Sequence, residues 1–446
     1  MFTSFAPLIA PILSMCILTL GNGFFTTLTT VQLSNMQMST VMIGIISATY
    51  FAGMMLGSFF SQNIIAKVGH IRSYSVFAAL MSICCLFQGV VEDPLIWSIL
   101  RFICGFALAG LFILMESWCL SSVEIKYKGR IMGFYLFAFY MAQSAGQLLL
   151  KIEYSSELVA FCIISALACF SIIPVCLTRF TAPEPEKPEF VSPLKYFKII
   201  PLGIIAAFIA GGVLSCVYTM LPLSLKSVNF SNSQIASLMS ITIFGGMLFQ
   251  LPIGKLSDIF DRRKVMFCVC VVCVVASVAV CFFHSGYWQM LVLCFIVGSV
   301  SFAIYPLSIS HASDKVDASK TIAVVSIITL FYGIGSMVGP LLVSEFIDYL
   351  GGITGFFLFL AVSAFVLGIY TLWKIYKTEP LDSEVKGSFT VITPRTAIGM
   401  AMVVEHNSSE SPDSIKNEEG NVVIDDTAAD TDIADNVDDG SDDTDR

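Results

Sequence analysis

Long apolar stretches follow one another along most of this chain, and only short polar breaks separate them. A helix needs about 20 mostly apolar residues to cross the hydrocarbon core of a bilayer. Runs of that length predict twelve transmembrane helices and therefore an all-α membrane protein. The expected spans are residues 6–30, 41–61, 73–91, 95–118, 130–150, 158–178, 199–222, 234–253, 265–283, 287–310, 321–344 and 353–373.

Two long polar stretches predict how the chain is divided. Residues 179–198 (RFTAPEPEKPEFVSPLKYFK) contain several prolines, which disfavour a continuous helix, so a cytoplasmic linker is expected there. The chain beyond residue 377 is rich in Asp, Ser, Thr and Asn and cannot bury enough apolar surface to fold. We therefore expect an N-terminal six-helix bundle at 1–178, the linker at 179–198, a C-terminal six-helix bundle at 199–377 and a disordered acidic cytoplasmic tail at 378–446.

Composition agrees with a membrane environment. Of the 446 residues, 56% are hydrophobic and 13% are charged, whereas about a quarter of a soluble domain is charged. The net charge of −9 belongs to the tail: residues up to 377 carry 20 Lys and Arg against 15 Asp and Glu, and the rest carry 4 against 18. Most of the 14 cysteines lie inside apolar runs and are expected to pack as free thiols.

The basic residues predict the orientation of the chain. With a cytoplasmic N-terminus, the cytoplasmic segments carry 17 Lys and Arg, whereas the outer segments carry only Lys151 and Lys226. Cytoplasmic loops are enriched in these residues. We expect a monomeric, multi-pass protein of a bacterial cytoplasmic (inner) membrane with both termini in the cytoplasm.

The two halves of the sequence resemble each other at an offset of about 192 residues. AGQLLL (145–150) falls on VGPLLV (338–343), and KVGHIR (67–72) falls roughly on FDRRKV (260–265). Gly105 falls on Gly298 at the same offset. Duplicated six-helix halves with a solute site between them are a known transporter arrangement.

Several motifs resemble the major facilitator superfamily over about residues 5–377. GKLSDIFDRRK (254–264) resembles the family's G-x-L-[AS]-D-x-x-[GD]-R-R loop, and Arg101 with Gly105 resembles its R-x-x-x-G motif. The first-half copy of the loop departs from the pattern, because Gln62 and Ala66 replace its Gly and Asp. The resemblance implies the major facilitator fold and secondary active transport of a small solute by alternating access, as efflux or metabolite transport.

Longer segments are similar to one branch of that family. These are GFALAGLFILMESW (105–118), GRIMGFYLFAFYMAQSAGQLLL (129–150) and the Tyr305-Pro306 turn, which resemble a YcaD-like bacterial branch.

Charged residues within the spans are candidates for function, because each costs about 2.5–3.5 kcal/mol to insert. Arg101 has two interpretations, an arginine that anchors the helix at the interface and a buried cation that binds solute or supports a proton carrier. The resemblance favours the second. Glu116 lies 15 residues further on, about 22 Å along a helix, and is predicted to pair with Arg130 or Lys128 in a gate or to form a surface salt bridge.

The second-half loop is predicted to control gating. Asp258 is expected near a helix N-terminus, where the macrodipole stabilises a carboxylate. By the resemblance, Asp258 and Arg262 would bias the chain between inward and outward opening. Asp314 is assigned to the same gate, and the neighbouring His311 is expected to be solvated unless it senses protons.

Polar residues at helical spacing mark faces that need not meet lipid. Asn22 and Thr26 form such a stripe, as do Gln143 with Gln147, and Tyr218 and Tyr305 belong to two more. One interpretation of each stripe is helix–helix hydrogen bonding. The other is a solute site, which the family resemblance favours. The predicted substrate-binding residues are Asn22, Thr26, Arg101, Gln143, Gln147, Tyr218 and Tyr305.

Several classes of function find no support in the sequence. No nucleotide loop, metal cluster or nucleophile–base pair is recognisable, so we expect no cofactor, no metal, no nucleic-acid partner and no enzyme. The expected partners are a small-molecule solute and the lipid bilayer, and proton coupling is left open because spans one, two, five, seven and eight lack acidic residues. The alternative is a transport-inactive membrane sensor or assembly platform that signals through its acidic tail.

Overall fold

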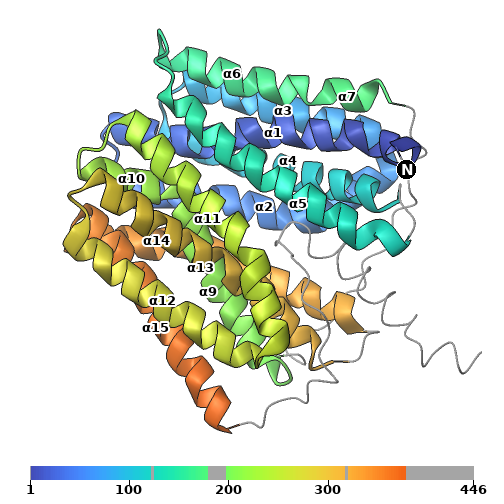
Figure 1. The fold of residues 1–446 in the computed structure, drawn as a ribbon. Coiled ribbons are helices and arrows are strands. Elements are labelled where there is room, and N and C mark those ends of the chain that lie inside the picture. The colour runs from blue at the N-terminus through green and yellow to red at the C-terminus, as the bar shows by residue number, and fades with distance from the viewer. Residues whose placement is uncertain (1, 122–124, 179–196, 317–319, 378–446) are drawn as a thin grey trace, which may run out of the picture. The chain divides into compact units, whose positions relative to one another are not determined.

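The computed structural model describes residues 2–121, 125–178, 197–316 and 320–377. Within these ranges the chain is helical and contains no strand (Figure 1). The elements are α1 (Phe2–Asn35), α2 (Thr40–Val68), α3 (His70–Val90), α4 (Pro94–Ser121), α5 (Ile125–Gln147), the 3-10 turn η1 (Leu148–Lys151), α6 (Glu157–Phe170), α7 (Ile172–Cys176), α9 (Pro201–Thr219), α10 (Leu221–Ser227), α11 (Asn232–Ile259), α12 (Arg262–Phe283), α13 (Tyr287–Ser313), α14 (Thr321–Leu350) and α15 (Gly352–Lys377).

Most of these helices are built to cross a membrane. In the described part of the chain, 11 helical segments are long and apolar enough to do so, with α6 and α7 forming one of them. The helix α5, whose first turns carry three basic residues, is not among them. Large apolar side chains such as Phe87 (54% exposed) and Phe365 (56% exposed) point outward. This surface suits lipid and not water, so the chain is a multi-pass membrane protein.

The apolar pattern predicts where the helices lie better than where they break. Each predicted span coincides with helical residues, although α1, with 34 residues, and α14, with 30, extend well past their spans. The seventh predicted span is divided, because α9 ends at Thr219 and α10 restarts with Pro222 in its first turn. The total of twelve spans stays a prediction. The linker positions 179–196 and the tail 378–446 lie outside the described residues.

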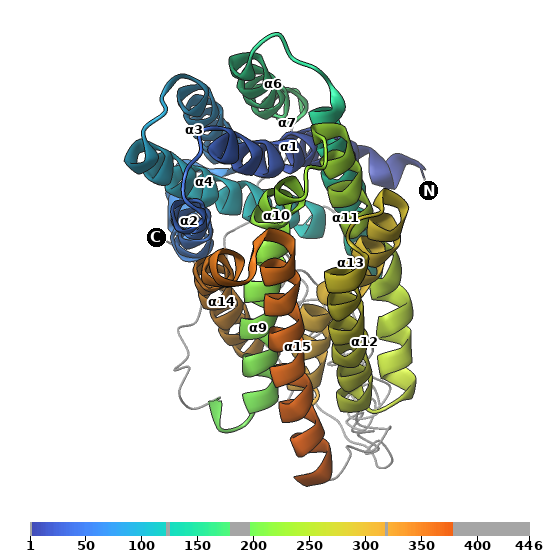
Figure 2. The same cartoon turned by 90° about the vertical axis from the view of Figure 1, so that its left-hand side faces the viewer.

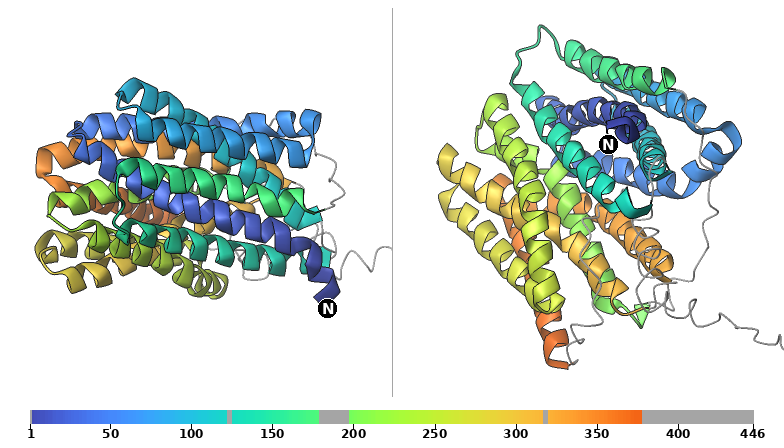
Figure 3. Two further views of the ribbon diagram at one scale, coloured as in Figure 1. Left: turned by 90° about the horizontal axis from the view of Figure 1, so that it is seen from above. Right: turned by 45° about the vertical axis from the view of Figure 1, so that its right-hand side comes forward.

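Helix pairing follows the same order in both halves of the sequence. In the first, α2 packs on α4, α1 on α5 and α3 on α6; in the second, α11 packs on α13, α9 on α14 and α12 on α15. Figure 2 shows α9, α15 and α12 beside one another below α1, α3, α4 and α6, and Figure 3 shows the helices from two more directions.

Matched glycines set the closest of these contacts. A Cβ added at Gly105 of α4 would collide with the carbonyl oxygen of Tyr50 on α2, and one added at Gly298 of α13 would collide with that of Thr242 on α11. Tyr50 and Thr242 are separated by about 192 residues, as are the two glycines. Gly146 likewise packs on the Leu20 carbonyl, and Gly339 packs on that of Gly212. The weak sequence repeat therefore corresponds to equivalent helix crossings, where only glycine lets the backbones approach.

Candidate functional site

Hydrogen bonds join the N-terminal helices (α1–α7) to the C-terminal helices (α9–α15) near the end of α1. The Thr30 hydroxyl donates to the carbonyl oxygen of Thr219 over 2.6 Å. Lys226 Nζ donates to the carbonyl oxygen of Val31 over 3.3 Å and to the side chain of Asn35. The positive charge of Lys226 near the last turn of α1 opposes the negative end of the helix dipole. We call this end of the helices the closed side.

Contacts at two other helix pairs extend the closed side. The Ser144 hydroxyl of α5 donates to the carbonyl oxygen of Ser240 on α11 over 2.9 Å. At Gly44 of α2, an added Cβ would lie 2.7 Å from the carbonyl oxygen of Pro340 on α14, so these backbones touch. In Figure 1 the two sets of helices meet near α10 and diverge from there toward the first residues of α5 and the last of α15.

Aromatic and amide side chains form a second contact between the sets. The ring of Phe302 on α13 lies 5.8 Å from that of Tyr140 and 5.6 Å from that of Tyr218. Gln250 of α11 donates to the Tyr140 hydroxyl and to the Phe302 carbonyl, each over 3.2 Å. The structure thus brings the predicted Tyr218 to the interface. Gln250 and Phe302 were missed, although an amide inside the apolar run of α11 was a usable signal.

Four residues of the N-terminal helices form what we call the polar cluster: Asn22, Tyr50, Arg101 and Gln143. The Tyr50 hydroxyl donates to Asn22 Oδ1 over 3.3 Å, and Asn22 Nδ2 donates to Gln143 Oε1 over 3.5 Å. The Arg101 guanidinium carbon lies 4.2 Å from the Tyr50 ring centre and 4.7 Å from that of Phe25. Arg101 is 1% exposed, so the interpretation as an interface anchor is wrong.

The sequence predicts three members of this cluster but not Tyr50. A tyrosine in an apolar helix carries little signal, because its ring suits a core equally well. Tyr50 can be recognised as a member of the cluster only once the packing of α2 against α1 and α4 is known.

Other predicted binding residues make bonds within one set of helices. Thr26 donates to the carbonyl oxygen of Gly23 over 3.0 Å, within its own helix. Gln147 Nε2 donates to the same carbonyl over 2.9 Å, and Thr27 donates to the Gln147 side-chain oxygen. Tyr305 is hydrogen-bonded to Thr329 over 3.0 Å. The bonds of Gln147 tie α1 to α5 and that of Tyr305 ties α13 to α14, as the helix–helix interpretation predicts.

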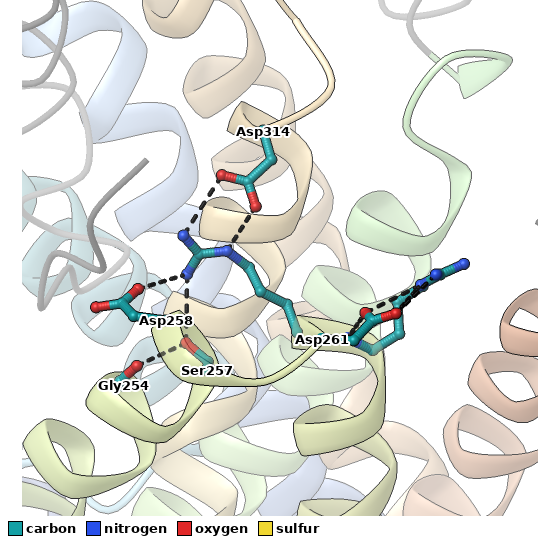
Figure 4. Close-up of polar contacts among 7 residues, drawn as sticks. Gly254, Ser257, Asp258, Asp261 and Asp314 are labelled. Atoms are coloured by element: carbon teal, nitrogen blue, oxygen red, sulfur yellow. Dashed lines mark hydrogen bonds and ion pairs between the residues drawn. The ribbon is translucent and has the colours of Figure 1, made fainter. Parts of the chain in front are cut away.

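An arginine cluster lies at the far end of α11 from the closed side. Arg262, at the start of α12, contacts Asp314 over 2.6 Å, Asp258 over 3.4 Å and the Ser257 hydroxyl over 3.3 Å. Figure 4 shows the two carboxylates on different sides of this guanidinium. Arg262 is 2% exposed, so the cluster locks the ends of α11, α12 and α13 together by charge-assisted bonds.

The expected helix-dipole role belongs to a different carboxylate. Asp258 lies in the last turn of α11, where the dipole disfavours a negative charge, so its expected position near a helix N-terminus is wrong. Asp261 is the N-cap of α12 and accepts from the backbone N–H of Arg263 over 2.9 Å. Burial alone would raise the pKa of Asp261, but the hydrogen bonds and charge of Arg263 outweigh it and hold that pKa below its ordinary value.

The remaining predicted gating residues lie in contrasting environments. Glu116 is 5% exposed, within α4. Arg130 is exposed on α5. His311 is 4% exposed, so the expectation of a solvated helix-end histidine is wrong. In the described residues, no three His, Cys, Asp or Glu side chains are grouped to hold a metal ion.

Helices of this length, with polar clusters buried between them, define the class as a polytopic α-helical membrane protein. The sequence model of the Major Facilitator Superfamily matches residues 11–223 and again 203–406. The chain belongs to the major facilitator superfamily. It is therefore a secondary transporter for small solutes and not an enzyme.

Relatives and solved structures agree with this assignment. The MFS-type transporter YcaD of Salmonella paratyphi A (strain ATCC 9150 / SARB42) and that of Escherichia coli (strain K12 / DH10B) are each 28% identical over 343 residues, which are 76% of this chain and 88% of theirs. The predicted YcaD-like branch is thus confirmed. The crystal structure of the nucleoside transporter NupG has a TM-score of 0.68 at 17% identity and covers 85% of this chain and 100% of its own. At that identity the likeness shows the fold alone.

Proposed function

We propose that this chain carries a small solute across a bacterial inner membrane by alternating access between two six-helix bundles. In this proposal α5 also crosses the membrane, which brings the number of spans to twelve. The bundles are residues 1–178 and 199–377, joined by the linker 179–198 and followed by the acidic tail. Both termini face the cytoplasm, which the 17 to 2 distribution of basic residues supports.

One observation carries the proposal: Thr30, Ser144 and Lys226 form hydrogen bonds between the two sets of helices at the closed side, and from there the sets diverge toward the first residues of α5 and the last of α15 (Figure 1). Such an arrangement suits one end state of a rocking movement. The other state would exchange the contacts of Thr30, Ser144 and Lys226 for contacts at the opposite ends.

The residue roles follow from this movement. Asn22, Arg101 and Gln143 of the polar cluster and Tyr218 at the aromatic contact would bind the solute, with Tyr305 beside them. Gln147 would support them by holding α1 against α5, and Thr26 by its hydrogen bond within α1. Arg262 with Asp258 and Asp314 would stabilise the present state, and Glu116 and Arg130 would take part in the gate.

Solute exchange in proteoliposomes tests this function. A thermal-shift screen of a metabolite library on the purified chain first identifies a solute that binds. Counterflow of that solute then needs alternating access but no ion gradient. Arg262→Met is expected to slow counterflow at least about fivefold, the lower end of typical coupling energies, while the solute still raises the unfolding temperature.

Two variants accompany this experiment. Lys264→Met removes an exposed charge next to the cluster and should leave counterflow unchanged. Asp258→Asn, at a half-exposed position, is a milder change in case Arg262→Met does not fold. Unchanged counterflow in both cluster variants would exclude the gating roles. A wild type that binds a solute but never exchanges it would exclude transport of that solute class.

A further inference from the structure

We propose that the polar cluster binds the carboxylate group of a monoanionic organic solute. This inference rests on the proposed transport function and names the chemical class of its substrate. It depends on the charge and the hydrogen-bonding capacity around Arg101.

Among the described residues, no acidic side chain forms a salt bridge with Arg101. Its guanidinium lies between the rings of Phe25 and Tyr50 and is 1% exposed. The helices α1, α2, α3 and α5 contain no aspartate or glutamate. On Arg101's own helix, Glu116 lies about 22 Å further along the axis, and Asp93, which precedes the first turn, lies about 12 Å back along it. A buried cation is costly unless an anion accompanies it, and arginine keeps its charge in proteins.

The buried atoms of the cluster that lack a hydrogen-bond partner among the described residues are donors. Arg101 Nε and Nη1 and Gln143 Nε2 are buried and have no hydrogen-bond partner among the described residues. Gln143 Oε1 already accepts from Asn22, and Asn22 Oδ1 already accepts from Tyr50. A site with surplus N–H groups fits a ligand atom that only accepts, and both oxygens of a carboxylate do so.

The cluster also lies on helix faces that meet the other set of helices. Asn22 is four residues before Thr26 and eight before Thr30, whose hydroxyl bonds to Thr219 of α9. Gln143 is three residues after Tyr140 and shares its helix face, and Tyr140 packs on the Phe302 ring of α13 and accepts a hydrogen bond from Gln250 of α11. A solute held here would therefore lie where the two sets part.

The single positive charge of Arg101 favours a ligand with a single negative charge. A single carboxylate neutralises Arg101, whereas a phosphate dianion would leave a negative charge buried without a partner. The observations thus favour an organic monocarboxylate over the dianionic form of inorganic phosphate.

Thermal unfolding of the full-length chain in detergent, followed by tryptophan fluorescence, tests this inference. The probes are monocarboxylates from acetate to phenylpropionate, the uncharged amide of each, and inorganic phosphate. We expect at least one acid to raise the unfolding temperature while its amide and phosphate do not. Arg101→Gln should raise the half-saturating concentration of that acid about thirtyfold or more, as removal of a buried charge partner does.

Further variants separate binding from folding. Arg101→Gln should not lower the unfolding temperature of the ligand-free protein, because it removes an uncompensated buried charge, whereas a structural arginine would give a clear loss. Arg101→Lys keeps the charge without the planar fork and should retain part of the response. Arg72→Gln, at an exposed position on α3, should respond like the wild type.

The inference is wrong if no acid stabilises the wild type, if acids and amides act alike, if phosphate protects equally, or if Arg101→Gln keeps the full response. Counterflow of an uncharged solute would exclude the carboxylate site and leave the transport function standing. Acid binding without counterflow would exclude transport and leave the site standing.

Discussion

Arg101 and Arg262 are both almost completely buried, at 1% and 2% exposure, but the groups that surround their charges differ. Arg262 has two carboxylate partners, whereas Arg101 is held by aromatic rings. A buried cation that holds helix ends together, such as Arg262, needs counter-ions that belong to the protein. At a transport site the counter-ion can arrive with the solute and leave with it.

The two carboxylates around Arg262 should differ in their contribution to stability. Asp314 lies 2.6 Å away with its side chain 6% exposed, and Asp258 lies 3.4 Å away with its side chain 35% exposed. We expect Asp314→Asn to cost about 3–5 kcal/mol of unfolding free energy, as breaking a buried pair does. Asp258→Asn should cost about 1 kcal/mol or less. Denaturant unfolding in detergent measures both, and equal losses would mean that burial does not rank them.

The spacing of residues in the sequence predicts some of these side-chain contacts and not others. Asp258 and Arg262 are four residues apart and close to a family motif, so their pairing was predictable. The bond from Arg262 to Asp314 spans 52 residues and depends on how α12 packs on α13. Tyr50, Gln250 and Phe302 were missed for the same reason, since an isolated polar or aromatic residue becomes part of a site only through tertiary contact.

At the scale of helices, hydrophobicity predicts position because every span must cover its backbone polar groups and face lipid. It does not predict breaks. The apolar run continues through Ser171 and Met220, yet α6 ends at Phe170 and α9 ends at Thr219. At the first break Ser171 accepts a hydrogen bond from Tyr74 of α3 over 3.0 Å, a contact that no local pattern encodes.

The matched glycine crossings give a prediction at this scale. Gly105→Ala and Gly298→Ala each place a methyl group against a carbonyl oxygen of a neighbouring helix. Overpacking of this kind costs about 1–3 kcal/mol, so both variants should unfold at lower temperature and by similar amounts. Gly133→Ala on α5 is the control, because a Cβ there meets nothing within 4 Å. A loss in only one of the pair would contradict the equivalence of the two crossings.

The conformational state of the whole molecule is beyond sequence analysis in principle. A transporter uses one sequence to support two arrangements that differ by a few kcal/mol, so no pattern of residues can say which one is populated. What the chain does reveal is where the two states must differ. Gly105 and Gly298 each pack against a helix of their own set. Gly44 packs against the other set, at the carbonyl oxygen of Pro340.

That contrast separates stability from conformation. Gly44→Val adds bulk where α2 and α14 touch, and moving the sets apart at the closed side relieves the clash. At about 1–3 kcal/mol for the clash, the population of the present state relative to the other should fall about fivefold or more. Gly105→Ala stresses a contact within one set and should lower stability without changing the populations.

Distances between spin labels measure this shift, with labels attached to a ketone-bearing amino acid so that the 14 native cysteines stay. One pair at Ile152 and Ser233 reports on the closed side, and one at Lys67 and Lys255 reports on the opposite ends; all four are exposed. In Gly44→Val the first distance should lengthen and the second should shorten. Because a rigid rocking movement couples the two ends, a change in one distance without the other would contradict alternation between two bundles, even if solute still crossed the membrane.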